Sequence, residues 1–76
     1  MEETVILNGL EILIGVDIES IRDPEGKTLN HLKWMINEMK TKEFSQGKFN
    51  RWLGYIQGVL VMKNITSLNI ERERNR

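Results

Sequence analysis

The segment richest in side chains able to bind a ligand is the decapeptide RWLGYIQGVL, which runs from Arg51 to Leu60. Arg51 and Tyr55 are four residues apart and would share one face of a helix. A guanidinium pairs with phosphate or carboxylate through two hydrogen bonds, and an aromatic ring stacks on planar groups. Gln57 adds an amide donor and acceptor. These residues predict a site for a small anionic ligand such as a nucleotide. The structural alternative is an Arg–Glu ion pair beside a half-buried tyrosine.

A second candidate group is formed by His31 and Trp34, three residues apart. An imidazole can hydrogen-bond a ligand and can change its charge near neutral pH. Helices joined by a short connection run antiparallel, so His31 is expected nearer Val59 than Arg51 within one chain. We therefore expect a site that uses both His31 and Arg51 to combine two subunits. The alternatives are a surface or capping role for His31 and a core or interface role for Trp34.

Gly54 and Gly58 are four residues apart and would lie on one face of the same helix. Each costs up to about 1 kcal/mol relative to alanine in a helix interior. The pair therefore predicts close approach by another surface, either within the chain, from another subunit or from a ligand. Together with Trp52, these glycines are the candidate close-packing or interface residues.

The composition argues against catalysis and against a bound metal. The chain has no cysteine and a single histidine, which excludes thiolate and multi-histidine metal sites within one chain. No stretch resembles an acidic calcium loop, and the two glycines lack the Lys-Ser/Thr of a phosphate-binding loop. The carboxylates are scattered, so no general acid–base pair stands out. We expect a non-enzymatic protein without a cofactor.

Residues 1–21 predict a β segment. They are rich in valine and isoleucine, and Asn8-Gly9 interrupts two apolar runs. Asn-Gly between β-forming residues is a strong hairpin signal, because both residues tolerate positive φ. We expect strands near 4–7 and 10–14, and the apolar pattern allows the second to continue past Gly15 to Ile18. The stretch from Arg22 to Lys27, with the only proline, predicts a loop.

Residues 28–76 predict a helical segment. Thr28 is expected to cap a helix near 29–42, Ser45-Gln46-Gly47 to break the chain, and a second helix to run near 48–62. A short charged helix should follow from Thr66 or Ser67. The apolar stripes of the two long helices are Leu29, Leu32, Ile36 and Met39, then Phe49, Leu53, Ile56 and Leu60. The predicted fold is a single α+β domain: a hairpin or strand pair, an antiparallel helical hairpin and a short C-terminal helix.

Size and charge limit the partners. A chain of 76 residues buries only roughly 60% of its unfolded surface, so without disulfides or metal we expect a homo-oligomer. The net charge is zero, which disfavours general attraction to nucleic acid. The longest apolar run, Ile12 to Val16, is too short to span a bilayer, and Glu2-Glu3 is unlike a secretory signal. We expect a cytoplasmic protein that makes no membrane contact.

Three blocks together resemble a group of small bacteriophage-encoded accessory proteins. They are HLKWM from His31, RWLGYIQGVL from Arg51, and the charged tail from Ser67. That group carries H-L-x-W-M, then R-W-L-G-Y/F-I/V-Q-G-V/L-L, then a short capped helix. The match covers roughly the last 46 residues. The resemblance implies a phage or prophage origin and therefore a location in the host-cell cytoplasm, and it assigns no activity.

The expected function is that of a phage-type accessory binding protein, active as a homo-oligomer. It would sequester a small anionic, nucleotide-like signal or block a host protein, and counter-defence is one such role. The alternative is a small DNA- or RNA-binding regulatory protein that uses Lys48, Arg51 and the Arg72–Arg76 tail. A salt titration separates the two, because nucleic-acid binding weakens steeply as salt rises.

Overall fold

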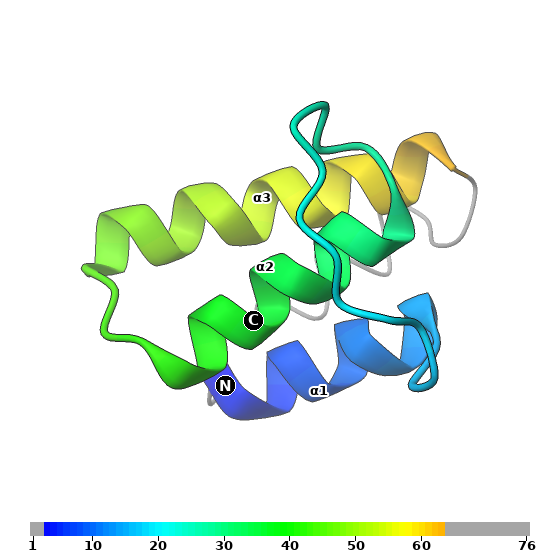
Figure 1. Cartoon of the computed structure of the whole chain (residues 1–76). Helices are drawn as coiled ribbons and strands as arrows, with labels where there is room; N and C mark the ends of the chain where they lie inside the picture. The colour runs from blue at the N-terminus through cyan, green and yellow to red at the C-terminus, as the bar shows by residue number, and fades with distance from the viewer. Residues whose placement is uncertain (1–2, 64–76) are drawn as a thin grey trace.

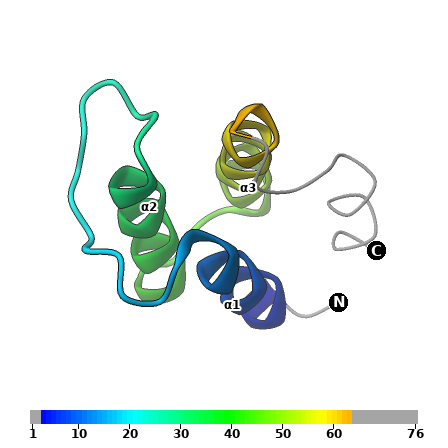
Figure 2. The ribbon, with the colours of Figure 1, turned by 90° about the vertical axis from the view of Figure 1, so that its right-hand side faces the viewer.

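The computed structural model describes residues 3–63, which form three α-helices: α1 (Glu3–Ile14), α2 (Leu29–Thr41) and α3 (Gln46–Met62). Consecutive helices run in opposite directions (Figure 1). Seen end-on, they occupy the corners of a triangle, and the connection between α1 and α2 passes along the outer side of α2 (Figure 2). Residues 3–63 contain no strand, so the predicted α+β class is wrong there. The helix predicted from Thr66 or Ser67 lies outside the described residues.

The predicted N-terminal hairpin is instead helix α1. Its buried side chains recur at helical spacing, and Asn8 and Gly9 lie in mid-helix rather than in a turn. The apolar runs on either side of Asn8-Gly9 are compatible both with two paired strands and with one apolar face of a helix. In the folded chain this face packs against α2, and that packing favours the helix. The helix ends at Gly15, whose φ of 117° is strained for other residues. The buried residues of α1 are Ile6, Leu7, Leu10 and Ile14.

The two predicted long helices are confirmed, with small changes at their ends. Thr28 caps α2, and its hydroxyl accepts a hydrogen bond from the His31 N–H at 3.1 Å. Ser45 caps α3 in the same way through the Lys48 N–H at 3.2 Å. The helix therefore begins at Gln46, two residues before the predicted start. The Ser45 hydroxyl accepts a hydrogen bond from a backbone N–H of the first turn, so the turn forms even though it contains Gly47.

The core is formed where α2 packs against both α1 and α3. All three helices contribute, and the apolar stripes predicted for α2 and α3 point into it. No helix within residues 3–63 combines the length and the apolar character needed to cross a membrane. The fully buried large side chains at the centre are Leu10, Leu32, Ile36, Ile56 and Leu60.

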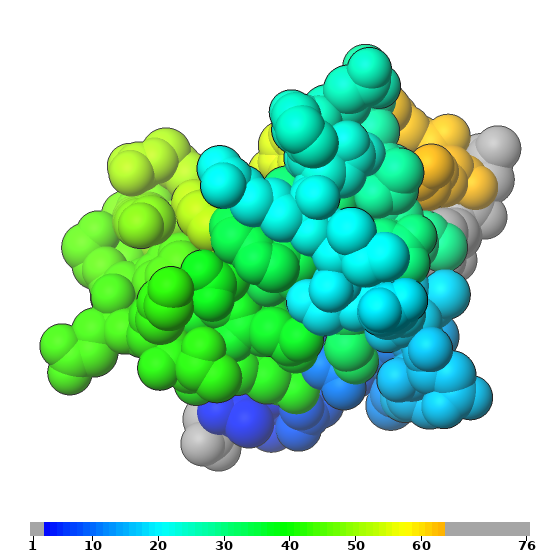
Figure 3. Space-filling view, viewed as in Figure 1, coloured from blue at the N-terminus to red at the C-terminus, as the bar shows by residue number. Residues whose placement is uncertain are grey.

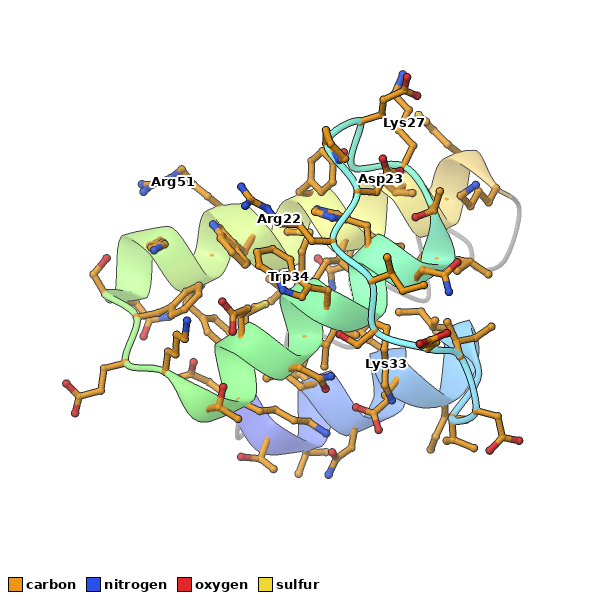
Figure 4. The ribbon with its side chains drawn as sticks, viewed as in Figure 1. Arg22, Asp23, Lys27, Lys33, Trp34 and Arg51 are labelled. Atoms are coloured by element: carbon orange, nitrogen blue, oxygen red, sulfur yellow. The ribbon has the colours of Figure 1, made fainter. Side chains whose placement is uncertain are left out.

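A polar contact on the outer edge of the core joins α1 to α2. The Glu11 carboxylate receives Lys33 Nζ at 3.1 Å on one oxygen and Lys40 Nζ at 3.0 Å on the other. Lys33 is largely buried, and its side chain extends from α2 towards α1 (Figure 4). The hydrogen bond from Lys40, reinforced by Lys33 against the opposing effect of burial, lowers the pKa of Glu11. A buried lysine without Glu11 would be costly, so this carboxylate fixes how α1 lies on α2.

We expect Glu11→Gln to lower the free energy of unfolding by about 1 kcal/mol at pH 7, the upper range for partly exposed ion pairs. Because the pKa of Glu11 is lower in the folded state than in the unfolded state, its ionised carboxylate stabilises the fold at pH values above the unfolded-state pKa. This stabilisation is lost as the pH falls through the folded-state pKa. The difference between wild type and variant should therefore shrink below about pH 4. Urea unfolding from pH 7 to pH 3 measures it. The control is Glu43→Gln, at an exposed site without an ion pair among the described residues. If the difference in unfolding free energy between wild type and Glu11→Gln did not change with pH, the stabilising role of the Glu11 ion pairs would be contradicted.

Candidate functional site

Residues 19–28, which we call the strap, cross the beginning of α2 and lie against α3. The strap turns sharply at Gly26, whose φ is 72° and whose N–H donates to the Asp23 carbonyl oxygen at 2.9 Å. The Tyr55 hydroxyl of α3 donates to the Gly26 carbonyl oxygen at 2.7 Å. A Cβ built on Gly26 would lie 2.8 Å from that hydroxyl, so both the backbone angle and the contact require glycine.

Three further hydrogen bonds tie the strap to α2. The Asp23 N–H donates to His31 Nδ1 at 3.0 Å. The Ile21 N–H donates to the Asn30 carbonyl oxygen at 3.2 Å, and Asn30 Nδ2 donates to the Glu19 carbonyl oxygen at 3.0 Å. A backbone N–H can only donate, so His31 Nδ1 is the acceptor and carries no proton in this contact. The histidine thus has a structural role, whatever its Nε2 atom binds.

The strap also places a guanidinium on a row of neighbouring rings, two pairs of which are tilted by 30° and 34° and the third of which is edge-to-face. The row, which we call the aromatic row, consists of His31, Trp34, Trp52 and Phe44 in that order. Neighbouring ring centroids are 5.3, 6.0 and 4.9 Å apart, within the range of favourable aromatic pairs. The four side chains are half-buried, and the two tryptophans and Phe44 rest on the core. The row therefore has one edge in the core and one edge at the surface.

Cations lie over this row without acidic partners. Arg22 sits over the Trp34 ring at 5.5 Å (Figure 4), and Lys48 lies 4.5 Å from the Phe44 centroid and 5.4 Å from that of Trp52. Such contacts contribute about 0.5–1 kcal/mol each at exposed sites. Neither cation makes an ion pair among the described residues, in contrast to the lysines that bind Glu11 and Glu38.

A surface depression of about 380 Å³ lies beside the row and is lined by His31, Met35, Arg51, Trp52 and Tyr55. One chain therefore brings His31 and Arg51 to the same surface, and the predicted need for two subunits is wrong. The prediction compared helix registers alone, whereas the wide rings on α3 fill the distance between these two residues. Arg51 extends from α3 away from α1, and its guanidinium has no ion pair among the described residues (Figure 4).

A second depression of about 300 Å³ adjoins the first across His31, Trp52 and Tyr55. The strap forms its other wall, to which Arg22 and Asp23 belong, and Trp34 also lines it. In the space-filling view the surface is recessed between the strap and the first half of α3 (Figure 3). The two depressions share lining residues and make one continuous open surface.

The remaining predicted residues lie elsewhere. Gln57 is buried and lines a separate depression near the start of α1, together with Ile6 and Phe49, so it does not join the other candidates. Gly54 and Gly58 are exposed, and no described atom lies within 4 Å of a Cβ built on either. The close approach that they predicted is thus not made within residues 3–63.

Sequence reasoning missed Arg22 and Phe44 as parts of this surface. The neighbouring proline and glycine correctly place Arg22 in a loop, but only the folded strap brings its guanidinium over the Trp34 ring. The aromatic character of Phe44, eight residues before Trp52 and across a helix cap, was the one signal present in the sequence. Within residues 3–63 no three histidine or acidic side chains are grouped to hold a metal ion. What the surface offers is aromatic faces and cations, which suit binding.

No family model, no curated protein and no solved structure matches this chain.

The role of His31 in holding the strap can be separated from any role in binding. We expect His31→Leu, which removes the acceptor, to lower the free energy of unfolding by about 1 kcal/mol and to speed amide exchange at Asp23. His31→Asn retains an acceptor oxygen near the Nδ1 position and should keep most of the protection. Helix propensity alone would favour leucine, so it cannot produce this order. Equal exchange rates at Asp23 in the two variants would show that the hydrogen bond contributes nothing.

Gly54 and Gly58 allow a test of what covers their face of α3. If the face is open to solvent, Gly58→Ala should raise stability by up to about 1 kcal/mol, the helix propensity difference. Gly54→Ala should do the same, and thermal unfolding with sedimentation measures both effects. A lower melting temperature together with a lower sedimentation mass would show instead that another subunit packs on the glycines.

Proposed function

We propose that this chain is a non-enzymatic binding protein that holds a small anionic ligand with a planar ring, such as a nucleotide-like signal. The observation that carries the proposal is the position of Arg51. Arg51 lines an open depression with His31, Trp52 and Tyr55, and its exposed guanidinium makes no ion pair among the described residues. A guanidinium held beside aromatic rings without an acid is suited to a phosphate on a planar ligand.

The dimensions of the depression suit this class of ligand. A volume of about 380 Å³ lies at the small end of the roughly 300–1,000 Å³ typical of ligand pockets. The rings of Trp52 and Tyr55 offer stacking surface, and His31 retains its Nε2 atom for a hydrogen bond because only Nδ1 is used by the strap. The Tyr55 hydroxyl is already engaged with Gly26, so Tyr55 contributes its ring rather than its hydroxyl.

Self-association is the second part of the proposal. Exposed apolar side chains remain on α1, just beyond its C-terminal end and at the end of α3, and a chain this small gains stability when copies cover such surfaces. A homo-oligomer would also enclose a ligand more fully than one open depression does. The exposed side chains in question are Val5, Ile12 and Val16, with Met62 at the end of α3.

The biological role proposed here is that of a phage-encoded accessory protein in the host cytoplasm. Its support is the resemblance carried by the HLKWM and RWLGYIQGVL blocks. Such a protein would remove a small signal used in host defence, or block a host protein through the same surface. The alternative, a DNA- or RNA-binding regulator, is favoured by a separate observation: the aromatic row lies beside Lys48 and Arg51.

Calorimetry with a panel of mononucleotides and cyclic nucleotides tests the ligand class. We expect at least one to bind, and Arg51→Gln to weaken that binding by about 1.5–3 kcal/mol, the range for a hydrogen bond to a charged group. Lys63→Gln loses the same charge at an exposed position outside the depressions and should bind as wild type does. Unchanged affinity in Arg51→Gln would refute the site. A silent panel would refute the ligand class and favour a host protein as the partner.

A further inference from the structure

The aromatic row is longer than one nucleotide needs. The Arg51 depression uses His31 and Trp52, whereas the row also includes Trp34 and, on the far side of Trp52, Phe44. We propose that this face binds a short stretch of single-stranded nucleic acid, with successive bases along the aromatic row and phosphates at Arg22, Arg51 and Lys48. The inference rests on the proposed function and extends it from a single nucleotide to a strand.

The spacing of the rings supports successive stacking. Adjacent centroids lie 4.9–6.0 Å apart, the planes of His31, Trp34 and Trp52 are tilted by 30° and 34° from ring to ring, and Phe44 stands edge-on to Trp52. Exposed cations lie over Trp34, Trp52 and Phe44, so those faces are accessible, and a single strand can turn its backbone between bases to offer one base to each ring. Single-strand binding domains combine such aromatic platforms with a cationic groove, and their sites begin at about 4 nucleotides. The four rings therefore fit a strand of roughly that length.

The charge distribution supports phosphate contacts in spite of the zero net charge. The lysines that form ion pairs are Lys33, Lys40 and Lys42, and all three are on α2 or its C-terminal end. The cations around the aromatic row lack such pairs among the described residues. Asp23 and Glu25 of the strap line the adjoining depression and are the opposing charges, and Asp23 Oδ1 accepts a hydrogen bond from the Glu25 N–H. Local charge thus favours about three phosphate contacts, and the binding should depend only modestly on salt.

Without a ligand, the ring faces are occupied by the cations themselves. Arg22 covers Trp34, and Lys48 covers Phe44 and Trp52. Both side chains are long and exposed, so a base can take the ring face while the cation moves to the adjacent phosphate. Binding of the strand thus replaces each contact between a cation and a ring by two contacts: the base stacks on the ring, and the cation pairs with the phosphate. Paired bases cannot make these stacks, so the surface discriminates against duplexes.

Intrinsic fluorescence reports this binding directly, because the only two tryptophans of the chain are Trp34 and Trp52. We would titrate the full chain with dT mononucleotide, dT tetranucleotide and dT octanucleotide, the matching uridine series, and an eight-base-pair duplex. Each added stacked base should raise affinity by about 5- to 150-fold, from the 1–3 kcal/mol that such stacks contribute. The gain should level off near the tetranucleotide. Comparison of the dT and uridine series separates DNA from RNA as the source of the strand.

Variants locate the strand on the row. Phe44→Leu should weaken the tetranucleotide much more than the mononucleotide, since Phe44 lies outside the Arg51 depression and reaches it only through its contact with Trp52. Lys48→Gln, at an exposed position that keeps the fold, should make the slope of log affinity against log salt less steep by about 0.7, from about −2 in wild type. Lys63→Gln should leave that slope unchanged. Circular dichroism confirms that each variant is folded.

Each outcome separates this inference from the proposed function. A mononucleotide that binds at Arg51 with no gain for longer strands overturns the strand inference and leaves the proposed function in place. A duplex that binds as tightly as the single strand also overturns it. Failure of every nucleotide and strand overturns both. A tetranucleotide that binds where no mononucleotide does supports the strand and refutes the small-ligand proposal.

Discussion

Burial of α2 is the constraint on which the other elements depend. Its buried apolar side chains, Leu32, Met35, Ile36 and Met39, form one stripe, and the buried Lys33 widens the covered arc towards α1. Helices α1 and α3 cover part of α2, and the strap passes along the outer side where neither helix lies (Figure 2). The arrangement of the whole described chain follows from enclosing this one helix.

The polar contacts are consequences of the same enclosure. Lys33 is drawn under α1 by its place between buried positions of α2, and Glu11 supplies the charge that makes its burial tolerable. On the opposite side, the strap brings backbone groups against α2 and α3, and His31 and Tyr55 satisfy two of them. Residues that look like ligand-binding groups in the sequence therefore also hold the strap in place.

The candidate surface combines three parts of the chain that are distant in sequence. Arg22 comes from the strap, Trp34 from α2, and Arg51 with Trp52 from α3 (Figure 4). Because the rings rest on the core and on one another, their positions are set by packing rather than by a ligand. Such a preformed aromatic surface costs little ordering entropy when a planar ligand stacks on it.

The sequence alone determined the two long helices, the cap at Thr28 and the apolar stripes, because these features depend on residues within one or two turns; at Ser45 it indicated part of a break rather than a cap. It also indicated Arg51 and His31 as candidates from their chemistry. Tertiary structure decided the rest. The segment 3–14 carries a pattern compatible with strand or helix, and only burial against α2 selects the helix. Likewise, no local rule places Arg22 over Trp34 or turns Gly54 and Gly58 outward, because those positions depend on how separate helices and the strap pack together.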